Sequence, residues 1–135
     1  IFGGSPETFT RDLQWKAFTP VLMGMSGWAK AARKHPWWYD EPYRSINRDY
    51  LKLKMRLMPY MYTAAYETEI SGAPILRGLM WDYPNDPNAN TETYKNQFFL
   101  GSFPLIKLNG GNLSPTNDLY LKSAPVLFNF SSLAF

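Results

Sequence analysis

The side chains most able to bind a ligand or take part in a reaction are concentrated in HPWWYDEPY, residues 35–43. It holds four aromatic rings, two carboxylates and the only histidine of the chain. Binding pockets combine aromatic faces with a few well-placed polar groups, and a sugar fits both, because its ring can stack while its hydroxyls bond to carboxylates. A packed loop corner is the alternative, and the stretch alone favours neither.

Other kinds of site are poorly supported by the residue types. The chain has no cysteine and one histidine, which argues against a thiolate metal site and a Ser/His triad. His35, Asp40 and Glu41 could form a metal site, but adjacent loop carboxylates more often face water or cap a helix. No glycine-rich phosphate motif is present. We therefore expect no metal and no cofactor.

Glycoside cleavage needs two carboxyl groups on either side of the scissile bond. The chain has 11 acidic residues, and none stands in a context that indicates a nucleophile or a raised pKa. Composition and spacing therefore identify no catalytic residue in this chain.

Bulk properties limit the partners. A length of 135 residues fits one domain, and no apolar run is long enough for a membrane span. A net charge of +3 with interspersed acids argues against nucleic acid, so we expect neither a membrane nor a nucleic-acid partner. Only 3 of the 25 charged residues fall in the last 35 positions, so this tail differs from the rest.

Two helices must position the aromatic stretch. Ser5 and Pro6 suit the start of a helix that runs to Phe18. The second is predicted over 45–71, with Ser45 as its cap and Gly72 as its C-cap. Its apolar residues follow spacings of three and four: Ile46, Tyr50, Leu53, Leu57, Met61 and Ala64. The cations lie off this stripe: Arg48, Lys52, Lys54 and Arg56. Pro59 should kink the helix without ending it.

Short apolar runs between and after these helices predict strands. Val21–Met25 reads as a buried strand and Ile75–Tyr83 as another, while 94–100 reads as a short helix or turn. Strands alternating with helices indicate an α/β fold with a parallel sheet. A complete eight-stranded barrel takes about 250 residues, so we expect a piece of one.

Four blocks in order make the chain resemble glycoside hydrolase family 31: RDLQWKAFTP (11–20), EPY (41–43), LKLKMRLMPYMYT (51–63) and GAPILRGLMWDYPND (72–86). The family contains retaining α-glucosidases, α-xylosidases and α-transglucosylases. The resemblance covers about residues 1–101.

The resemblance implies a fragment of a (β/α)8 TIM barrel, from the end of strand seven to helix eight, running into a C-terminal β-sandwich. Residues 1–74 would be barrel and 75–101 its exit and the start of the sandwich. Residues 102–135 show no resemblance, which a frameshifted or mispredicted end would explain; an unfamiliar domain end is the alternative. The non-methionine start at Ile1 also suggests an incomplete chain.

The resemblance further implies a substrate site formed by Ile1, Phe2, Met25, Trp28, Trp37 and Trp38. Ile1 and Phe2 follow the aspartate-bearing end of strand seven. Met25 falls where the family commonly has the histidine of Arg-x-His. The three tryptophans resemble acceptor-binding aromatics of the 6-α-glucosyltransferase and cycloalternan-forming branch, with a core role as their alternative.

In the family the nucleophile and the acid/base are aspartates, and both would lie upstream of Ile1. The resemblance therefore implies a piece of an enzyme acting on α-gluco-oligosaccharides, with transfer favoured over hydrolysis, that is inactive alone. A small carbohydrate-binding module using Trp28, Trp37 and Trp38 is the alternative. The cellular location stays open.

Overall fold

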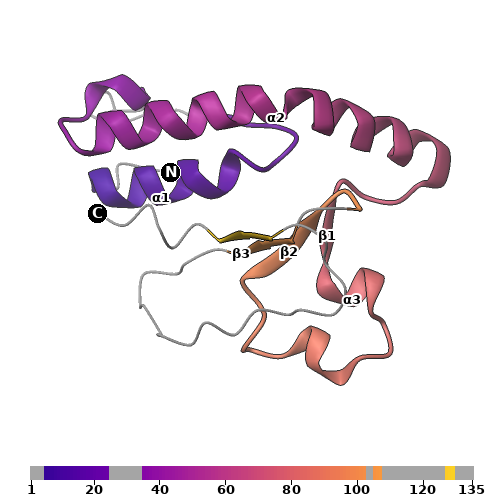
Figure 1. The fold of residues 1–135 in the computed structure, drawn as a ribbon. Coiled ribbons are helices and arrows are strands. Elements are labelled where there is room, and N and C mark those ends of the chain that lie inside the picture. Colours follow the sequence, from indigo (N-terminus) through magenta and orange to yellow (C-terminus); the bar gives the residue numbers. More distant parts are fainter. Residues whose placement is uncertain (1–4, 25–34, 103–104, 108–126, 130–135) are drawn as a thin grey trace. The chain divides into compact units, whose positions relative to one another are not determined.

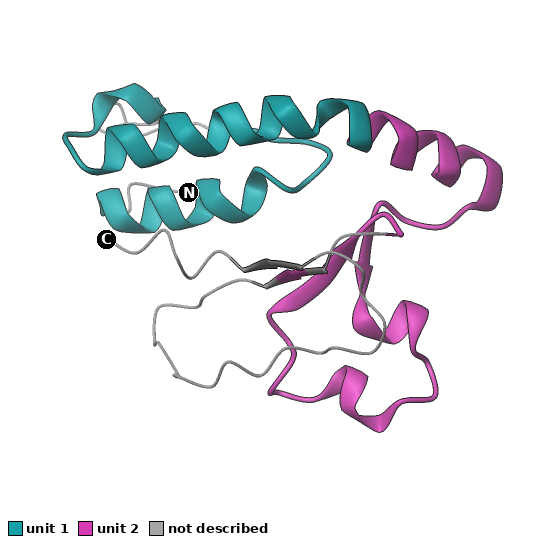
Figure 2. Ribbon diagram, viewed as in Figure 1, with its two compact units in different colours: residues 1–60 teal, residues 61–135 magenta. Residues whose placement is uncertain are grey.

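The computed structural model describes residues 5–24, 35–102, 105–107 and 127–129. The chain divides into two compact units, residues 1–60 and residues 61–135 (Figure 2). The long helix α2 contributes to both. This boundary lies inside α2, whereas the sequence places a division after residue 74, and that division stays a prediction.

The first helix, α1 (Pro6–Lys16), begins where its sequence predicts (Figure 1). The Ser5 hydroxyl accepts a hydrogen bond from the Thr8 backbone N–H at 3.2 Å, which satisfies one of the free donors of the first turn. Phe9 and Leu13 form the buried face. The helix ends two residues before the predicted Phe18.

The long helix α2 spans Tyr43–Ser71, so the prediction of Ser45 as its cap is wrong. Ser45 lies inside the first turn, and its backbone N–H donates to the Glu41 carboxylate at 3.1 Å. Glu41 therefore caps the helix from just before its start, where a negative charge also suits the helix dipole. The helix continues through Pro59, as predicted; a kink there stays a prediction.

The predicted apolar stripe is only partly the inner face of α2: Tyr50, Met61 and Ala64 are buried, whereas Ile46, Leu53 and Leu57 are half-buried. Two polar residues lie on the inner face as well. Positions on this face follow spacings of three and four: Asn47, Tyr50, Lys54, Leu57, Met61 and Ala64. Burial raises the pKa of Tyr50 to about 12. The sequence placed Lys54 on the outer face, which is wrong: its Nζ donates to the Thr19 carbonyl at 2.6 Å, just past the end of α1. Burial lowers the pKa of this ammonium.

The predicted strand Val21–Met25 is not a strand in its described part, residues 21–24. Val21 and Met23 are exposed, at 66% and 61%. A strand needs a hydrogen-bonded neighbour, and within the described part of the chain no segment pairs with this one. An apolar run alone could not reveal that.

In the second unit four short strands form one sheet in the order β1-β2-β3-β4. The strands are β1 (Leu76–Gly78), β2 (Gln97–Leu100), β3 (Leu105–Lys107) and β4 (Leu127–Asn129). The first two pairings are antiparallel and the third is parallel. The tail thus supplies two strands.

Two predictions for this unit need correction. The predicted strand Ile75–Tyr83 is β1 followed at once by the short helix α3 (Leu79–Asp82). The predicted helix or turn at 94–100 contains β2. Leu79 and Phe99 form a buried cluster, and Tyr83 packs on it with a ring distance of 6.2 Å to Phe99. Packing of α3 on the sheet therefore overrides the local β-propensity.

The chain leaves α2 through Gly72, whose φ of +73° is the left-handed conformation that favours glycine at a helix end. A 3₁₀ helix, η2 (Pro87–Asn90), follows α3; the Asp86 side chain caps it by accepting from the Asn88 backbone N–H.

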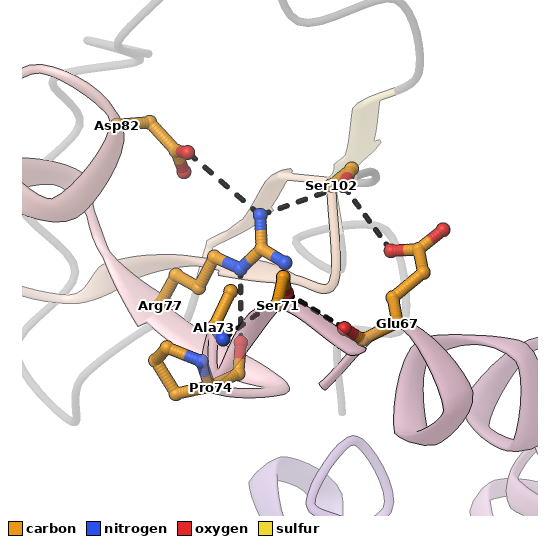
Figure 3. A network of polar contacts seen from close by, with 7 residues as sticks. All are labelled: Glu67, Ser71, Ala73, Pro74, Arg77, Asp82 and Ser102. Atoms are coloured by element: carbon orange, nitrogen blue, oxygen red, sulfur yellow. Dashed lines mark hydrogen bonds and ion pairs between the residues drawn. The ribbon is translucent and has the colours of Figure 1, made fainter. Parts of the chain in front are cut away.

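Arg77 connects several elements of the second unit (Figure 3). Its Nε donates to the Pro74 carbonyl at 2.9 Å, and its Nη1 lies 3.4 Å from the Ser102 hydroxyl and 3.8 Å from Asp82. Ser102 also donates to Glu67 on α2 at 3.4 Å. A buried cation needs such partners, because an unpaired one is costly to desolvate.

Glu41 should make the stability of α2 depend on pH. Hydrogen bonds from Ser45, with Arg44 and Arg48 nearby, lower its pKa below the ordinary 4.5. The ionised carboxylate therefore stabilises the fold at neutral pH, and this contribution disappears as the pH falls through the lowered pKa. We expect Glu41→Gln to lower the melting temperature at pH 7 and to reduce its fall between about pH 6 and 3, followed by circular dichroism. Glu69→Gln, at an exposed position of the same helix, is the control. Parallel pH curves for wild type and Glu41→Gln would contradict the capping role.

Arg77→Met should destabilise the second unit by about 1.5–3 kcal/mol, because the substitution leaves the Pro74 carbonyl and Asp82 without their cation. Urea unfolding measures the change. Arg56→Met removes an exposed arginine of α2 and should stay within about 0.5 kcal/mol of wild type. Equal effects of the two substitutions would show that the Arg77 contacts contribute nothing to stability.

Candidate aromatic binding site

The aromatic stretch divides into exposed and buried rings. Trp37 and Trp38 lie on a short 3₁₀ helix, η1 (Pro36–Trp38), and are 63% and 47% exposed. Tyr39, the next residue, is 5% exposed. A loop that packed all its rings would leave none for a ligand, whereas here two large rings reach solvent. Their exposure is compatible with stacking on a sugar, which stays a prediction.

His35 holds the two tryptophan rings in place. Its imidazole is stacked on Trp37, with ring centroids 4.8 Å apart and planes 8° from parallel. It meets Trp38 edge-on at 4.4 Å and 89°. Both arrangements are favoured by aromatic quadrupoles. Because the imidazole covers one face of the exposed Trp37 ring, the opposite face is the one that a ligand could use.

Tyr39 and Asn47 anchor this platform to the first unit. Tyr39 packs on Phe9 of α1 with ring centroids 4.7 Å apart. The Asn47 amide donates to the Pro36 carbonyl at 3.1 Å, at the start of η1. Asn47 is fully buried, and its Oδ1 has no hydrogen-bond partner among the described residues.

Our reading of the sequence missed Asn47, although a signal was available. Asn47 lies three positions before Tyr50, on the buried face of a helix, where a polar side chain is unusual. A buried amide is retained where it makes a specific bond, and here it fixes the backbone that carries the tryptophans.

The two carboxylates of the stretch serve α2. Glu41 caps it, and Asp40 lies 3.8 Å from Arg44 one turn further on. One oxygen of Glu41 is engaged by Ser45, and the interpretation in which these acids bond sugar hydroxyls stays a prediction. The Asp40 side chain is 92% exposed and keeps acceptor capacity.

Four predicted site residues lie outside the described residues: Ile1, Phe2, Met25 and Trp28. Only Trp37 and Trp38 of the predicted set can be placed, and the structure brings these two together through His35. Whether the other four join them stays a prediction.

Several of the described acids pair within one local segment. Glu7 pairs with Arg11 at 2.9 Å and Glu92 with Lys95, each within one helical or turn segment. Within the described ranges no cluster of three or more histidine and acidic side chains could hold a metal ion. No helix in those ranges is long and apolar enough to cross a membrane. The exposed rings of Trp37 and Trp38 are compatible with a flat, partly apolar ligand.

Known proteins resemble the chain over most of its length. Residues 2–64 match the TIM-barrel domain of glycosyl hydrolases family 31. The chain is 34% identical over 100 residues to alpha-glucosidase 2 of Bacillus thermoamyloliquefaciens, covering 74% of this chain and 12% of that protein. It is 32% identical over 136 residues to an alpha-xylosidase of Saccharolobus solfataricus, covering 96% and 18%, so this match reaches into the tail.

A solved structure supports the same relationship. A family 31 dextranase of Flavobacterium johnsoniae, solved in complex with glucose, matches with a TM-score of 0.67 and 31% identity, over 79% of this chain and 13% of that one. The chain thus spans less than a fifth of the length of each of these relatives. A family-specific domain match, relatives above 30% identity and a structural match agree, and the chain belongs to glycoside hydrolase family 31.

Proposed function

We propose that this chain is part of an enzyme that acts on α-gluco-oligosaccharides, in which Trp37 and Trp38 bind the acceptor sugar. The observation that carries the proposal is the pair of exposed rings, held by His35 and anchored through Tyr39 and Asn47, in a member of a family of α-glycoside-active enzymes. Transfer to a sugar acceptor is the favoured reaction, and hydrolysis is its alternative.

The proposal assigns the parts of the chain as follows. Residues 1–74 are the C-terminal part of the catalytic barrel, from the end of strand seven to helix eight. Residues 75–101 leave the barrel and begin a β-sandwich. The antiparallel pairing of β1 with β2 supports such a sandwich start, because sandwich sheets are antiparallel.

The reaction itself requires groups beyond this chain. A retaining glycosidase places a nucleophilic carboxylate and an acid/base carboxyl group about 5–5.5 Å apart. In the resemblance to the family, no acid of this sequence matches the nucleophilic aspartate or the acid/base aspartate. We therefore assign the chain a role in binding and orienting the acceptor, with the bond-breaking carboxylates supplied from elsewhere in the enzyme.

A non-catalytic carbohydrate-binding module is the second candidate. The same exposed platform favours it, because binding modules need a flat aromatic surface and no carboxylate pair. In the first candidate the tryptophans bind the acceptor of a transfer reaction, and in the second they only bind glucan. Measurements of activity and of binding can separate the two.

Residues 1–135 alone should release no glucose from maltose, isomaltose or an aryl α-glucoside, and no xylose from an aryl α-xyloside, because the two-carboxylate machinery is absent. A coupled glucose assay, and xylose detection by chromatography, would measure this. Turnover that disappears when an acid of this chain is changed to its amide, for example Asp40→Asn, would overturn the assignment.

Trp37→Ala should weaken binding of isomaltotriose or maltotriose by about 2- to 12-fold, the factor that 0.5–1.5 kcal/mol of ring stacking represents. Isothermal titration measures the affinity, and circular dichroism checks that the helices persist. Trp81→Ala is the matched control, since Trp81 is 54% exposed in the other unit. Equal losses for the two variants would contradict the platform.

The same substitution in an enzyme that contains this segment separates the two candidates. An acceptor subsite predicts that Trp37→Ala slows transfer to sugar acceptors more than hydrolysis of an aryl glucoside. Unchanged rates for both, with weaker glucan binding, would favour the binding module.

A further inference from the structure

A hollow beside α2 in the first unit shares Trp37 with the proposed sugar platform, and its other lining residues lie outside that platform. Its volume is ≈ 650 Å³, within the range of ligand-binding pockets. Four apolar side chains and four cations line it: Pro36, Trp37, Leu51 and Met55, with Arg44, Arg48, Lys52 and Arg56. All belong to the first unit.

The cations of this hollow form a regular row. They occupy positions 44, 48, 52 and 56, four residues apart, so each lies one turn and about 6 Å further along α2. The row therefore extends over about 18 Å on one side of the helix. Like charges one turn apart destabilise a helix slightly, so nothing in the helix itself requires this arrangement.

Local acids neutralise only part of the row. Arg44 and Arg48 lie 3.8 Å from Asp40 and Asp49, at the outer limit of an ion pair, and both acids are exposed. The Glu41 carboxylate also interacts with these two arginines. Lys52 and Arg56 have no ion pair within the described part of the chain. The hollow therefore keeps an excess positive charge, concentrated at the end nearer residue 56.

The floor beside the row is apolar. Met55 is 68% exposed and Trp37 is 63% exposed, while Leu51 is half-buried against the cluster around Phe9 and Leu13. Leu51 and Met55 are one turn apart, which matches the spacing of anchors in helix-in-groove recognition. Methionine suits such surfaces because its flexible, polarizable side chain adapts to a partner.

We propose that this hollow is a docking site for an amphipathic helix of a protein partner, with apolar residues on one face and glutamates or aspartates along its edge. The apolar face covers Leu51, Met55 and Trp37. The acidic edge, with its own i, i+4 spacing, meets the four cations. A neutral glucan would leave the cations unused, and a polyanion such as heparin would leave the apolar floor uncovered, so an acidic amphipathic segment matches both features.

The probe for this proposal is a fluorescein-labelled helical peptide of about three heptads, with leucines at the first and fourth positions and glutamates beside them. Its matched control has lysine at every glutamate position. Fluorescence anisotropy with residues 1–135 should show saturable binding of the glutamate peptide only. The affinity should fall as salt rises from about 0.05 to 0.5 M, because exposed charge pairs are screened.

Two substitutions test the two features separately. Arg56→Glu reverses a cation that has no described ion pair and should weaken binding about 3- to 10-fold. Met55→Ser removes an exposed apolar side chain from the floor of the hollow and should weaken peptide binding by a similar factor, about fivefold. Lys95→Glu and Ile70→Ser are the controls, and Ile70 has the same 68% exposure as Met55. Both controls should bind within about twofold of wild type.

Three results would overturn the proposal: no saturable binding, equal binding of the lysine peptide, or insensitivity to Met55→Ser. Tight binding of a heparin oligosaccharide that depends on Arg56 and not on Met55 would assign the row to a polyanion instead. Isomaltotriose affinity of Met55→Ser should equal that of wild type, so failure of the docking site and failure of the sugar platform remain distinguishable.

Discussion

Burial of Tyr39 is the contact on which the first unit depends. Its ring lies 4.7 Å from Phe9, and with Leu13 these residues form one cluster on which Tyr43 and Leu51 pack. The cluster joins α1, the segment after η1 and the first turns of α2. A single buried ring thus fixes three elements that are separated in sequence, and dispersion and hydrophobic burial together supply the stabilisation.

This anchoring also explains why the neighbouring tryptophans can be exposed. With Tyr39 turned into the core and Asn47 bonded to the Pro36 carbonyl, the backbone of η1 is held from both ends. Trp37 and Trp38 then stay 63% and 47% exposed, and His35 contacts both rings. Rings ordered before a ligand arrives lose less conformational entropy on binding, which favours affinity.

The second unit is organised differently, around a buried charge beside a small apolar cluster. Arg77 lies among Pro74, Asp82 and Ser102, while Leu79 of α3 packs with Phe99 of β2. A buried guanidinium has five donors and demands partners from several directions. Arg77 therefore fixes the position of the segment after α2 relative to the sheet. Strands of only three or four residues could not fix this position alone.

The sequence by itself determined the two long helices, α1 and α2, and the family. The helix signals are local, because each one affects only the residues close to it in sequence. They are Ser5-Pro6 at the start of α1, the spacing of three and four from Tyr50 to Ala64, and Gly72 at the end of α2. The family motifs lie in the same segments. Local signals did not identify the two polar residues of the inner face, because Lys54 and Asn47 are buried only through partners at Thr19 and Pro36, distant in sequence.

Only the tertiary structure decided which segments form strands and which rings of the aromatic stretch are buried. Residues 21–24 and Gln97–Leu100 are both largely apolar, yet within the described part of the chain only the second run pairs with neighbouring strands. Pairing between distant segments leaves no mark in a short window of sequence. In HPWWYDEPY the composition suits a sugar site and a packed corner equally. The fold buries one ring and exposes two, because Tyr39 packs on Phe9 while Trp37 and Trp38 remain about half or more exposed beside His35, and that difference arises from three-dimensional packing.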